Sequence, residues 1–193
     1  ASTLTRELAL AAMIEDNFSV ALVDLDPQGA TTHWWNRRKE RGDVQAPELF
    51  NAKEGIKGLL NSLELLRKEC NLVLVDCPPT VHPLIGELVS RADLSIVPTR
   101  PNISDLDAIG PVLNMLGRNV KRSFVITQIS SPRSLEAREA RTMLSSYAPV
   151  LGHTTNRIGY SRPSAAGLTG YEREITVGLE GRRLWSAIKE LSF

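Results

Sequence analysis

The chain has few of the residues that build metal centres and disulfide frameworks. Its 193 residues include two cysteines, Cys70 and Cys77, and three histidines that are scattered along the sequence. The two cysteines are too far apart for a C-x-x-C metal motif, and no zinc-binding group of residues is visible. We therefore expect the protein to occupy a reduced, cytoplasmic setting.

Long apolar runs and aromatic residues are also scarce. No run approaches the roughly 18 consecutive apolar residues that a membrane span needs. Residues 1–20 lack the basic start and small-residue cleavage site of a signal peptide. Aromatic residues make up 5% of the chain, which argues against a base-stacking platform for nucleic acid. A hydrophobic content of 42% and this length indicate one globular domain over residues 1–193.

Charge is unevenly distributed, although the formal net charge is only +1. Residues 121–193 hold 11 basic and 6 acidic residues, a balance of +5, so residues 1–120 carry −4. Arginine accounts for 17 of the 23 basic residues. A basic C-terminal third is a weak indication of contact with nucleic acid or phosphate, and an ordinary solvated surface is the alternative.

Short apolar runs alternate with amphipathic stretches along the chain. The runs predicted as strands are 18–24, 72–76, 94–98, 123–128 and 150–155. The predicted helices are 1–13, 29–41, 53–69, 84–90, 104–116, 134–147, 162–169 and 181–191, with a loop at 42–52. Ser104 and Ser134 are suited to cap the helices that they begin. This alternation predicts an α/β fold, a three-layer, doubly wound and mainly parallel sheet with helices on both faces.

Carboxylates follow two of the predicted strands. Residues 18–29, FSVALVDLDPQG, place Asp24 and Asp26 after an apolar run, and residues 72–79, LVLVDCPP, place Asp76 in the same way. Ligands bind at the carboxyl ends of the strands in an open parallel sheet. These side chains therefore predict a magnesium and phosphate site. For any one aspartate, a strand-end cap or a salt bridge is the alternative.

The order of these motifs carries a family resemblance. VDLDPQG, then VDCPP, then VPTRP resembles the ParA/MinD family of deviant-Walker P-loop ATPases, which segregate plasmids, chromosomes and other cargo. Residues 154–172, TTNRIGYSRPSAAGLTGYE, fit the small ParF-like members, which lack an N-terminal DNA-binding domain. The resemblance runs the length of the chain and implies a sheet of the P-loop NTPase type.

The family's phosphate-binding loop has no counterpart in the printed residues. One alignment of the first helix puts Ser2 at the loop's Ser/Thr position and Ala1 at the position of its lysine. An ungapped alignment back from Asp24 puts Thr3 at the lysine position instead. That lysine and the loop's backbone would hold the nucleotide phosphates. We expect the chain to be N-terminally incomplete, lacking the first strand and the loop. A natural loss of ATP binding is the alternative.

The resemblance also implies roles for the matching residues. Asp26 resembles the catalytic residue that positions the attacking water. Asp76 resembles the Walker B aspartate, which holds Mg²⁺ directly or through water, and Asp24 would organise the metal side of the site. Ser2, or Thr3, would supply a hydroxyl to Mg²⁺ at a helix N-terminus, where a phosphate is favoured.

Further nucleotide contacts are implied at the ends of later strands. By resemblance, the residues near the phosphates, base and ribose are Pro98, Thr99, Gln128, Asn156 and Arg157. A buried or capping role is the alternative for each polar side chain among them. Two tryptophans that follow the Asp pair, Trp34 and Trp35, are predicted to pack in the core or against a dimer partner.

The function implied is that of an ATPase that segregates or positions DNA or another cargo. ATP, with Mg²⁺, would close a homodimer that binds DNA non-specifically, and a ParB-like or other small adaptor protein would stimulate hydrolysis. The protein would be cytoplasmic and nucleoid-associated, without stable membrane insertion. The candidate DNA contacts are Lys121, Arg122, Arg162, Arg182 and Arg183.

Other functions stay open at this stage. A MinD-like protein would lie on a membrane through a basic amphipathic C-terminal helix, and packing of that helix on the domain is the alternative. The apolar positions concerned are Leu184, Trp185, Ile188 and Leu191. A non-catalytic interaction protein without a working P-loop is a further possibility. A metabolic enzyme on the same fold is disfavoured, because no cysteine pair for a cluster and no dedicated substrate pocket is visible.

Overall fold

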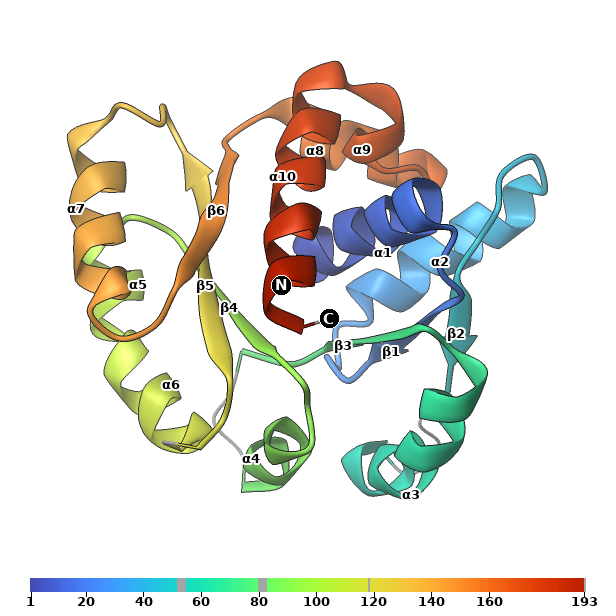
Figure 1. Cartoon of the computed structure of the whole chain (residues 1–193). Coiled ribbons are helices and arrows are strands. Elements are labelled where there is room, and N and C mark those ends of the chain that lie inside the picture. The colour runs from blue at the N-terminus through green and yellow to red at the C-terminus, as the bar shows by residue number, and fades with distance from the viewer. Residues whose placement is uncertain (52–54, 80–82, 118, 193) are drawn as a thin grey trace. The chain divides into compact units, whose positions relative to one another are not determined.

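A computed structural model describes residues 1–51, 55–79, 83–117 and 119–192, and it divides the chain into two compact units (Figure 1). Unit 1 consists of Ala1–Thr80 and Ile158–Arg182, and unit 2 consists of Val81–Arg157 and Arg183–Phe193. The last helix, α10 (Ile175–Ser192), contributes to both units. The expectation of one domain over the whole chain remains a prediction.

Unit 1 is built on a parallel sheet with the strand order β2-β1-β3. Its strands are β1 (Val20–Asp24), β2 (Glu48–Phe50) and β3 (Leu72–Asp76). Its other elements are α1 (Ser2–Asp16), α2 (Ala30–Arg41), α3 (Gly55–Glu69), α8 (Ile158–Ser161), the 3₁₀ helix η1 (Arg162–Ala166) and α9 (Gly170–Arg173). Figure 1 shows α1 and α2 on one face of β1 and β3, with α3 on the opposite face.

The sequences of β1 and β3 explain their position in the sheet. They read VALVD and LVLVD, and continuous apolar runs of this kind are typical of parallel strands with both faces covered. Residues 20–23 of β1 are all buried. The register pairs Asp24 of β1 with Asp76 of β3, so both carboxylates end at the same edge of the sheet.

Unit 2 holds a second parallel sheet, with the order β4-β5-β6. Its strands are β4 (Ser95–Thr99), β5 (Arg122–Ile129) and β6 (Val150–Thr155), and its helices are α4 (Pro83–Ser90), α5 (Ile103–Asp107), α6 (Ile109–Leu116) and α7 (Leu135–Ser145). The core lies between α6, β5 and α7 and is formed by Ile109, Phe124, Ile126, Ile129, Ala137, Ala140 and Leu144. Leu184 of α10 lies directly against Gly152 of β6.

The predicted α/β class with parallel strands is confirmed, and the differences are local. The strand β2 falls inside the predicted loop 42–52, because three residues on a sheet edge leave no periodicity to detect. The predicted helix 104–116 is two helices, and its cap is Asn102 rather than Ser104. The Asn102 side chain accepts a hydrogen bond from the Asp105 amide at 2.8 Å. Ser134 caps α7 as predicted.

The C-terminal region also departs from the predicted boundaries. The predicted helix 162–169 is the shorter 3₁₀ helix η1, which ends at Ala166 and is capped by Gly167, a residue with φ of 70°. The predicted helix 181–191 begins earlier, at Ile175. Thr176 and the glycines in this region are weak helix formers, so the residue pattern does not indicate the additional turns. Val177, which is buried, lies in the first of these turns. The predicted start of α3 at residue 53 lies outside the described residues.

The apolar face of α10 is buried. Of the four side chains on which the membrane-surface alternative rests, Leu184, Trp185 and Ile188 are at most 6% exposed, and Leu191 is half-buried. Lining a bilayer would require these side chains at the surface. In the described ranges, no helix combines the length and the apolar character that crossing a membrane requires.

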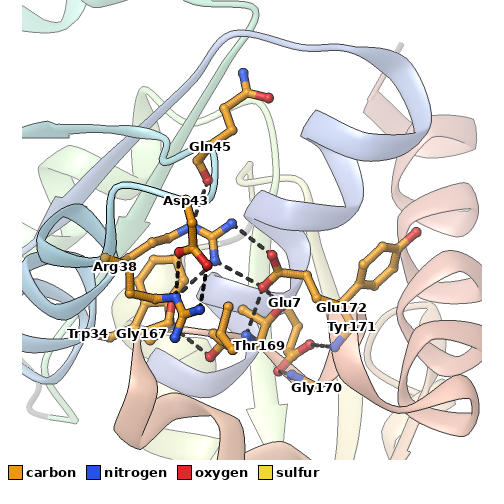
Figure 2. A network of polar contacts seen from close by, with 12 residues as sticks. Glu7, Trp34, Arg38, Asp43, Gln45, Gly167, Thr169, Gly170, Tyr171 and Glu172 are labelled. Carbon is orange, nitrogen blue, oxygen red and sulfur yellow. Dashed lines mark hydrogen bonds and ion pairs between the residues drawn. The ribbon is translucent and has the colours of Figure 1, made fainter.

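A buried polar network joins α2 to the start of α9 within unit 1 (Figure 2). Arg38 is 1% exposed, and its two Nη atoms donate to the two carboxylate oxygens of Glu172 at 2.8 and 2.9 Å. Its Nη1 also donates to the carbonyl of Gly167 at 3.1 Å, and its Nε donates to the carbonyl of Gln45 at 2.7 Å. The guanidinium lies 5.4 Å from the ring centre of Trp34, so one side chain connects three segments.

Glu172 is held from a second direction by Thr169. The Thr169 amide and hydroxyl both donate to Glu172 at 2.9 Å, which forms a capping box at the start of α9. Burial alone would raise the pKa of Glu172, but the hydrogen bonds from Arg38 and Thr169 outweigh burial and hold the pKa below its usual value. The pair is therefore ionised. Removing one partner of such a pair typically costs about 3–5 kcal/mol.

Glu7 adds α1 to the network. It is 4% exposed, and its carboxylate accepts hydrogen bonds from the amides of Gly170 at 2.9 Å and Tyr171 at 2.7 Å. These amides belong to the first turn of α9, which has no partner for them within the helix. Burial raises the pKa of Glu7 to about 7, although the two hydrogen bonds act in the opposite direction.

The close approach of Gly167 to α2 gives a first prediction. Gly167→Ala should destabilise the protein far more than Gly42→Ala. Both glycines have positive φ, 70° and 69°, a backbone that costs an alanine about 1 kcal/mol. A Cβ at Gly167 would lie 2.4 Å from the amide nitrogen of Arg38, whereas a Cβ at Gly42 would meet nothing within 4 Å. We expect an additional loss of about 1–3 kcal/mol for Gly167→Ala. Urea unfolding measures both, and equal losses would contradict this packing.

The buried carboxylate of Glu7 gives a second prediction. Its folded pKa of about 7 lies above the ordinary value of 4.5, so its contribution to stability is complete below about pH 4.5 and is lost as pH rises through 7. We expect this loss to be of the order of 3 kcal/mol. Glu7→Gln cannot ionise, so its unfolding free energy should depend less steeply on pH between 5 and 8. The exposed Glu136→Gln is the control, and a Glu7→Gln profile parallel to wild type would contradict the assignment.

Candidate functional site

Two carboxylates meet at the carboxyl end of the sheet in unit 1. Asp24 ends β1 and Asp76 ends β3, and the two residues are direct neighbours in the strand register. The amide of Leu25 donates to the carbonyl of Asp76 at 2.9 Å, which carries the pairing one residue further. The structure therefore brings together the two aspartates that the sequence pattern singled out.

The first turn of α2 supplies a hydroxyl to each carboxylate. The Thr31 hydroxyl donates to Oδ2 of Asp76 at 2.7 Å. The Thr32 amide and hydroxyl donate to Oδ2 of Asp24 at 2.8 and 3.0 Å, and the amide of Asp26 donates to Oδ1 of Asp24 at 3.2 Å. Both oxygens of Asp24 are thus engaged. The sequence reasoning missed the two threonines, although hydroxyl side chains that follow a strand, an Asp and a turn are a usual sign of a helix start.

Asp26 lies in the turn between β1 and α2. Its Oδ1 accepts from the amide of Gln28 at 2.9 Å, and its carbonyl accepts from the amide of Gly29 at 2.8 Å. This is the Asx turn that Asp forms with the backbone two residues on. Gly29 has φ of 61°, so the chain enters α2 through a left-handed residue. Oδ2 of Asp26 makes no hydrogen bond to any residue that the structure describes.

Asp76 has one carboxylate oxygen without a partner. The residue is 1% exposed, and its Oδ1 is buried and makes no hydrogen bond within the described ranges. An ionised carboxylate has about four acceptor positions, and leaving them unfilled in the interior costs free energy. Mg²⁺ suits this arrangement, because it binds through one or two carboxylates together with phosphate oxygens and waters.

The remaining side chains that could bind a metal favour magnesium over a metal that is held by protein ligands alone. In the described part of the chain, no group of three or more His, Cys, Asp or Glu side chains is placed to hold a metal ion. Cys77 follows Asp76, but burial raises the pKa of its thiol to about 11. It is therefore a protonated thiol at neutral pH and neither a nucleophile nor a ready metal ligand.

Arg6 brings a buried positive charge to the start of α1. Its Nη1 donates to the carbonyl of Ala30 at 3.3 Å and its Nη2 to the hydroxyl of Thr3 at 3.3 Å. Burial lowers its pKa, while the nearby carboxylates of Glu7, Asp76 and Asp24 act in the opposite direction. The sequence reasoning did not single out this arginine, because nothing in a helical pattern distinguishes a buried cation from an exposed one.

Ser2 and Thr3, the two residues predicted to offer a hydroxyl to the metal, are not hydrogen-bonded to the two aspartates. Ser2 is half-buried and Thr3 is exposed at the N-terminal end of α1. Between described residues, no hydrogen bond joins either hydroxyl to Asp24 or Asp76. The predicted metal set of Ser2, Asp24 and Asp76 therefore meets only at its two aspartates in this structure.

The remaining nucleotide contacts predicted from sequence fall at the carboxyl end of the sheet in unit 2. Thr99 ends β4, and its hydroxyl is buried without a partner among the described residues. Pro98 precedes it in the same strand. Asn156 and Arg157 follow β6 directly: the Asn156 amide donates to β5, and the Arg157 Nε donates to the preceding threonine hydroxyl at 2.6 Å. The structure thus gathers these predicted residues at one sheet edge.

Gln128 has an unusual backbone at this edge. Its φ is 58°, in the left-handed region, and the pairing of β5 with β6 shifts register between Ile126 and Ile129. Its amide donates to the hydroxyl of Thr154 at 3.3 Å, and its side chain is exposed. Bulges and left-handed non-glycine residues collect at functional sites. This conformation is consistent with the predicted ligand contact, which stays a prediction.

The five predicted DNA contacts differ in their surroundings. Arg182 forms an ion pair with Glu15 at 2.9 Å and lies over the ring of Tyr171, so its charge is partly neutralised. Two of the others donate to backbone carbonyls of their own unit. Four make no ion pair with any described residue: Lys121, Arg122, Arg162 and Arg183.

Comparison with characterised proteins identifies relatives, although no protein-family model matches the chain. Maintenance of carboxysome distribution protein A from Halothiobacillus neapolitanus is 30% identical over 146 residues, which cover 72% of this chain and 66% of that protein. Its namesake from Gloeobacter kilaueensis is 34% identical over 144 residues, 72% and 63% of the two chains. The chromosome-partitioning ATPase Soj of Thermus thermophilus is 31% identical over 121 residues, 50% of this chain and 49% of Soj. The chain therefore spans just under two thirds, or less, of these relatives.

Solved structures share the fold at low sequence identity. The MinC:MinD cell division complex of Aquifex aeolicus has a TM-score of 0.77 at 16% identity, covering 100% of this chain and 91% of that one. Apo McdA from Cyanothece has a TM-score of 0.73 at 14% identity, with 96% and 94% covered. A plasmid partition protein from Borrelia burgdorferi bound to AMPPNP has a TM-score of 0.71 at 15% identity, with 98% and 93% covered.

Sequence relatives, fold and motif order agree with one another. The relatives are 30–34% identical to this chain over the aligned residues, and they are positioning and partitioning proteins. The structures that share the fold are MinD, McdA and plasmid partition proteins. The strand-end aspartates of VDLDPQG and VDCPP lie side by side, as a shared nucleotide site would require. This chain belongs to the ParA/MinD family of P-loop ATPases.

Proposed function

We propose that the protein is a ParA-type ATPase that positions or segregates DNA or another cargo inside the cell. The observation that carries the proposal is the buried, unpartnered Oδ1 of Asp76 beside Asp24 at the end of a parallel sheet. An oxygen of this kind needs a cation or a bound water. The names of the relatives, carboxysome distribution and chromosome partitioning, support cargo positioning as the biological role.

Each carboxylate of the site has a distinct proposed role. Asp76 would hold Mg²⁺ through Oδ1, directly or through water, and the ion would neutralise the triphosphate charge that develops in hydrolysis. Asp26 would orient the attacking water with Oδ2, the oxygen that its turn leaves uncommitted. Asp24 would hold the loop and the start of α2 in place, since both of its oxygens accept hydrogen bonds from that segment.

We propose that a strand and a phosphate-binding loop complete the site beside β3. The strand β3 is apolar on both faces, yet it pairs with β1 alone within the described residues. Strands with this composition usually have a neighbour on each side. Ser2 or Thr3 would then follow that loop at the N-terminus of α1, where helix geometry favours a phosphate. A protein with no such loop, acting without catalysis, is the alternative that the test below separates.

We propose a working cycle from the family to which the chain belongs. ATP would close a homodimer that binds DNA non-specifically, and a small adaptor protein would stimulate hydrolysis and release it. The residues of unit 2 proposed to contact the nucleotide are Pro98, Thr99, Gln128, Asn156 and Arg157. We propose that the protein works in the cytoplasm, on the nucleoid. The MinD-like membrane alternative is less well supported, because the apolar face of α10 is buried.

A third prediction tests catalysis. In the whole gene product, Asp26→Asn should lower the rate of ATP hydrolysis about 100-fold while ATP-dependent dimerisation persists. Asparagine can still accept the turn hydrogen bond, but it has no negative charge to orient a water. Phosphate release measures the rate, and light scattering measures the dimer. The control is Asp43→Asn, since Asp43 pairs with Arg41 on the surface at 2.7 Å. A variant as active as wild type would refute this role for Asp26, and a wild type that never dimerises with ATP would refute the ATPase.

A fourth prediction concerns DNA. Arg183→Ala should weaken ATP-dependent binding to random-sequence DNA more than Arg182→Ala, because Arg182 is already paired with Glu15. Each lost phosphate contact should reduce the slope of log affinity against log salt by about 0.9. Fluorescence anisotropy over a series of salt concentrations measures both quantities. Equal effects of the two variants, or an unchanged slope for Arg183→Ala, would remove Arg183 from the DNA surface.

A further inference from the structure

We propose that Thr31 is a positioning residue for the magnesium carboxylate: its hydroxyl holds one oxygen of Asp76 so that the other stays free for the cation. The inference rests on the proposed function of the site. It concerns a residue that the shared motifs VDLDPQG and VDCPP do not contain. Thr31 would touch neither nucleotide nor metal and would act entirely through Asp76.

The contact between the two side chains is short and fully buried. Thr31 is 0% exposed, and its Oγ1 lies 2.7 Å from Oδ2 of Asp76. A hydroxyl has a single proton, so the proton that Thr31 gives to Asp76 is not available to another acceptor. A distance of this size is the usual one for a well-formed O–H···O hydrogen bond. The bond therefore fixes which oxygen of Asp76 is occupied by protein.

The free oxygen follows from that fixed bond. The terminal torsion of an aspartate is broad, so a strand-end carboxylate without a partner can turn either oxygen toward its surroundings. Thr31 is fully buried in the first turn of α2, and close packing around it holds the donor in one place. With Oδ2 held by Thr31, Oδ1 is left buried and unpartnered. The carboxylate is thus already oriented before a cation arrives.

The neighbouring aspartate shows the contrast. Asp24 accepts hydrogen bonds on both oxygens, from Thr32 on one and from the amide of Asp26 on the other. Of the two adjacent carboxylates, Asp76 is therefore the one with an oxygen that no donor among the described residues occupies. Two successive threonines in one helical turn thus each donate to a different aspartate, and only Asp76 keeps an oxygen without a hydrogen bond among the described residues. Because Thr31 and Thr32 belong to the same turn, a shift of the start of α2 would change both carboxylates together.

The test is metal affinity in the whole gene product with ADP bound. Mn²⁺ replaces Mg²⁺ as the probe, and its free concentration is read by electron paramagnetic resonance. Thr31→Val removes the hydroxyl at nearly constant shape and should weaken Mn²⁺ binding about 10-fold or more, the usual effect of losing a partner of a metal ligand. Thr31→Ser keeps the hydroxyl and should stay within about threefold of wild type. The matched control is Thr142→Val, an exposed residue of α7 whose hydroxyl bonds, among the described residues, to the carbonyl of Arg138 in the same helix at 3.0 Å.

The outcomes separate this inference from the proposed function. Wild type that binds Mn²⁺ with ADP, together with an equally tight Thr31→Val, overturns the role of Thr31 and leaves the ATPase proposal in place. Wild type that binds no Mn²⁺ with ADP overturns both. If Thr31→Val does not fold, Thr31→Ala removes the same hydroxyl without placing a methyl group against a buried oxygen. A folded Thr31→Ala with wild-type affinity would count against the inference in the same way.

Discussion

The ionised pair between Arg38 and Glu172 is the interaction on which the order of unit 1 depends. One buried guanidinium uses its donors on Gln45, seven residues further along the chain, and on Gly167 and Glu172, which are 129 and 134 residues away. Burying this charge would be costly without such complete pairing. Because Arg38 lies in the last turn of α2, the pair fixes where that end of the helix sits. The first turn of the same helix then carries the hydroxyls that hold the two aspartates.

The α2 helix therefore has two roles that meet in one element. Its last turn is anchored by charge, and its start is anchored by short hydrogen bonds to Asp24 and Asp76. A carboxylate site of this kind must be held within about half an ångström to work. The last turn of α2, with Arg38, stabilises the position of the helix, and the first turn, with Thr31 and Thr32, contacts the carboxylates of the site. Gly167 belongs to this design, because only a residue without Cβ lets the chain approach α2 so closely.

The site combines committed and uncommitted oxygens. Asp24 has both oxygens occupied, Asp26 has one free, and Asp76 has one that is free and buried. Three aspartates with the same side chain thus differ in how many oxygens are available to a ligand, because their hydrogen-bond donors differ. In unit 2, the left-handed Gln128 at a bulge and the unpartnered hydroxyl of Thr99 mark a second edge where the backbone departs from ideal pairing. Departures of this type are typical of residues that contact ligands.

The sequence by itself determined the fold class, the strands that carry Asp24 and Asp76, and the family. Those features depend on local apolar runs and on short motifs, which a linear chain records directly. It misplaced what depends on partners distant in sequence: β2 needs β1 to form, and the first turn of α10 contains the buried Val177. The tertiary structure alone decided that Thr31 holds Asp76, that Arg38 pairs with Glu172, and that Arg182 pairs with Glu15. Each of these contacts joins residues tens of positions apart, and hydrogen bonds at such separations leave no periodic trace in the sequence.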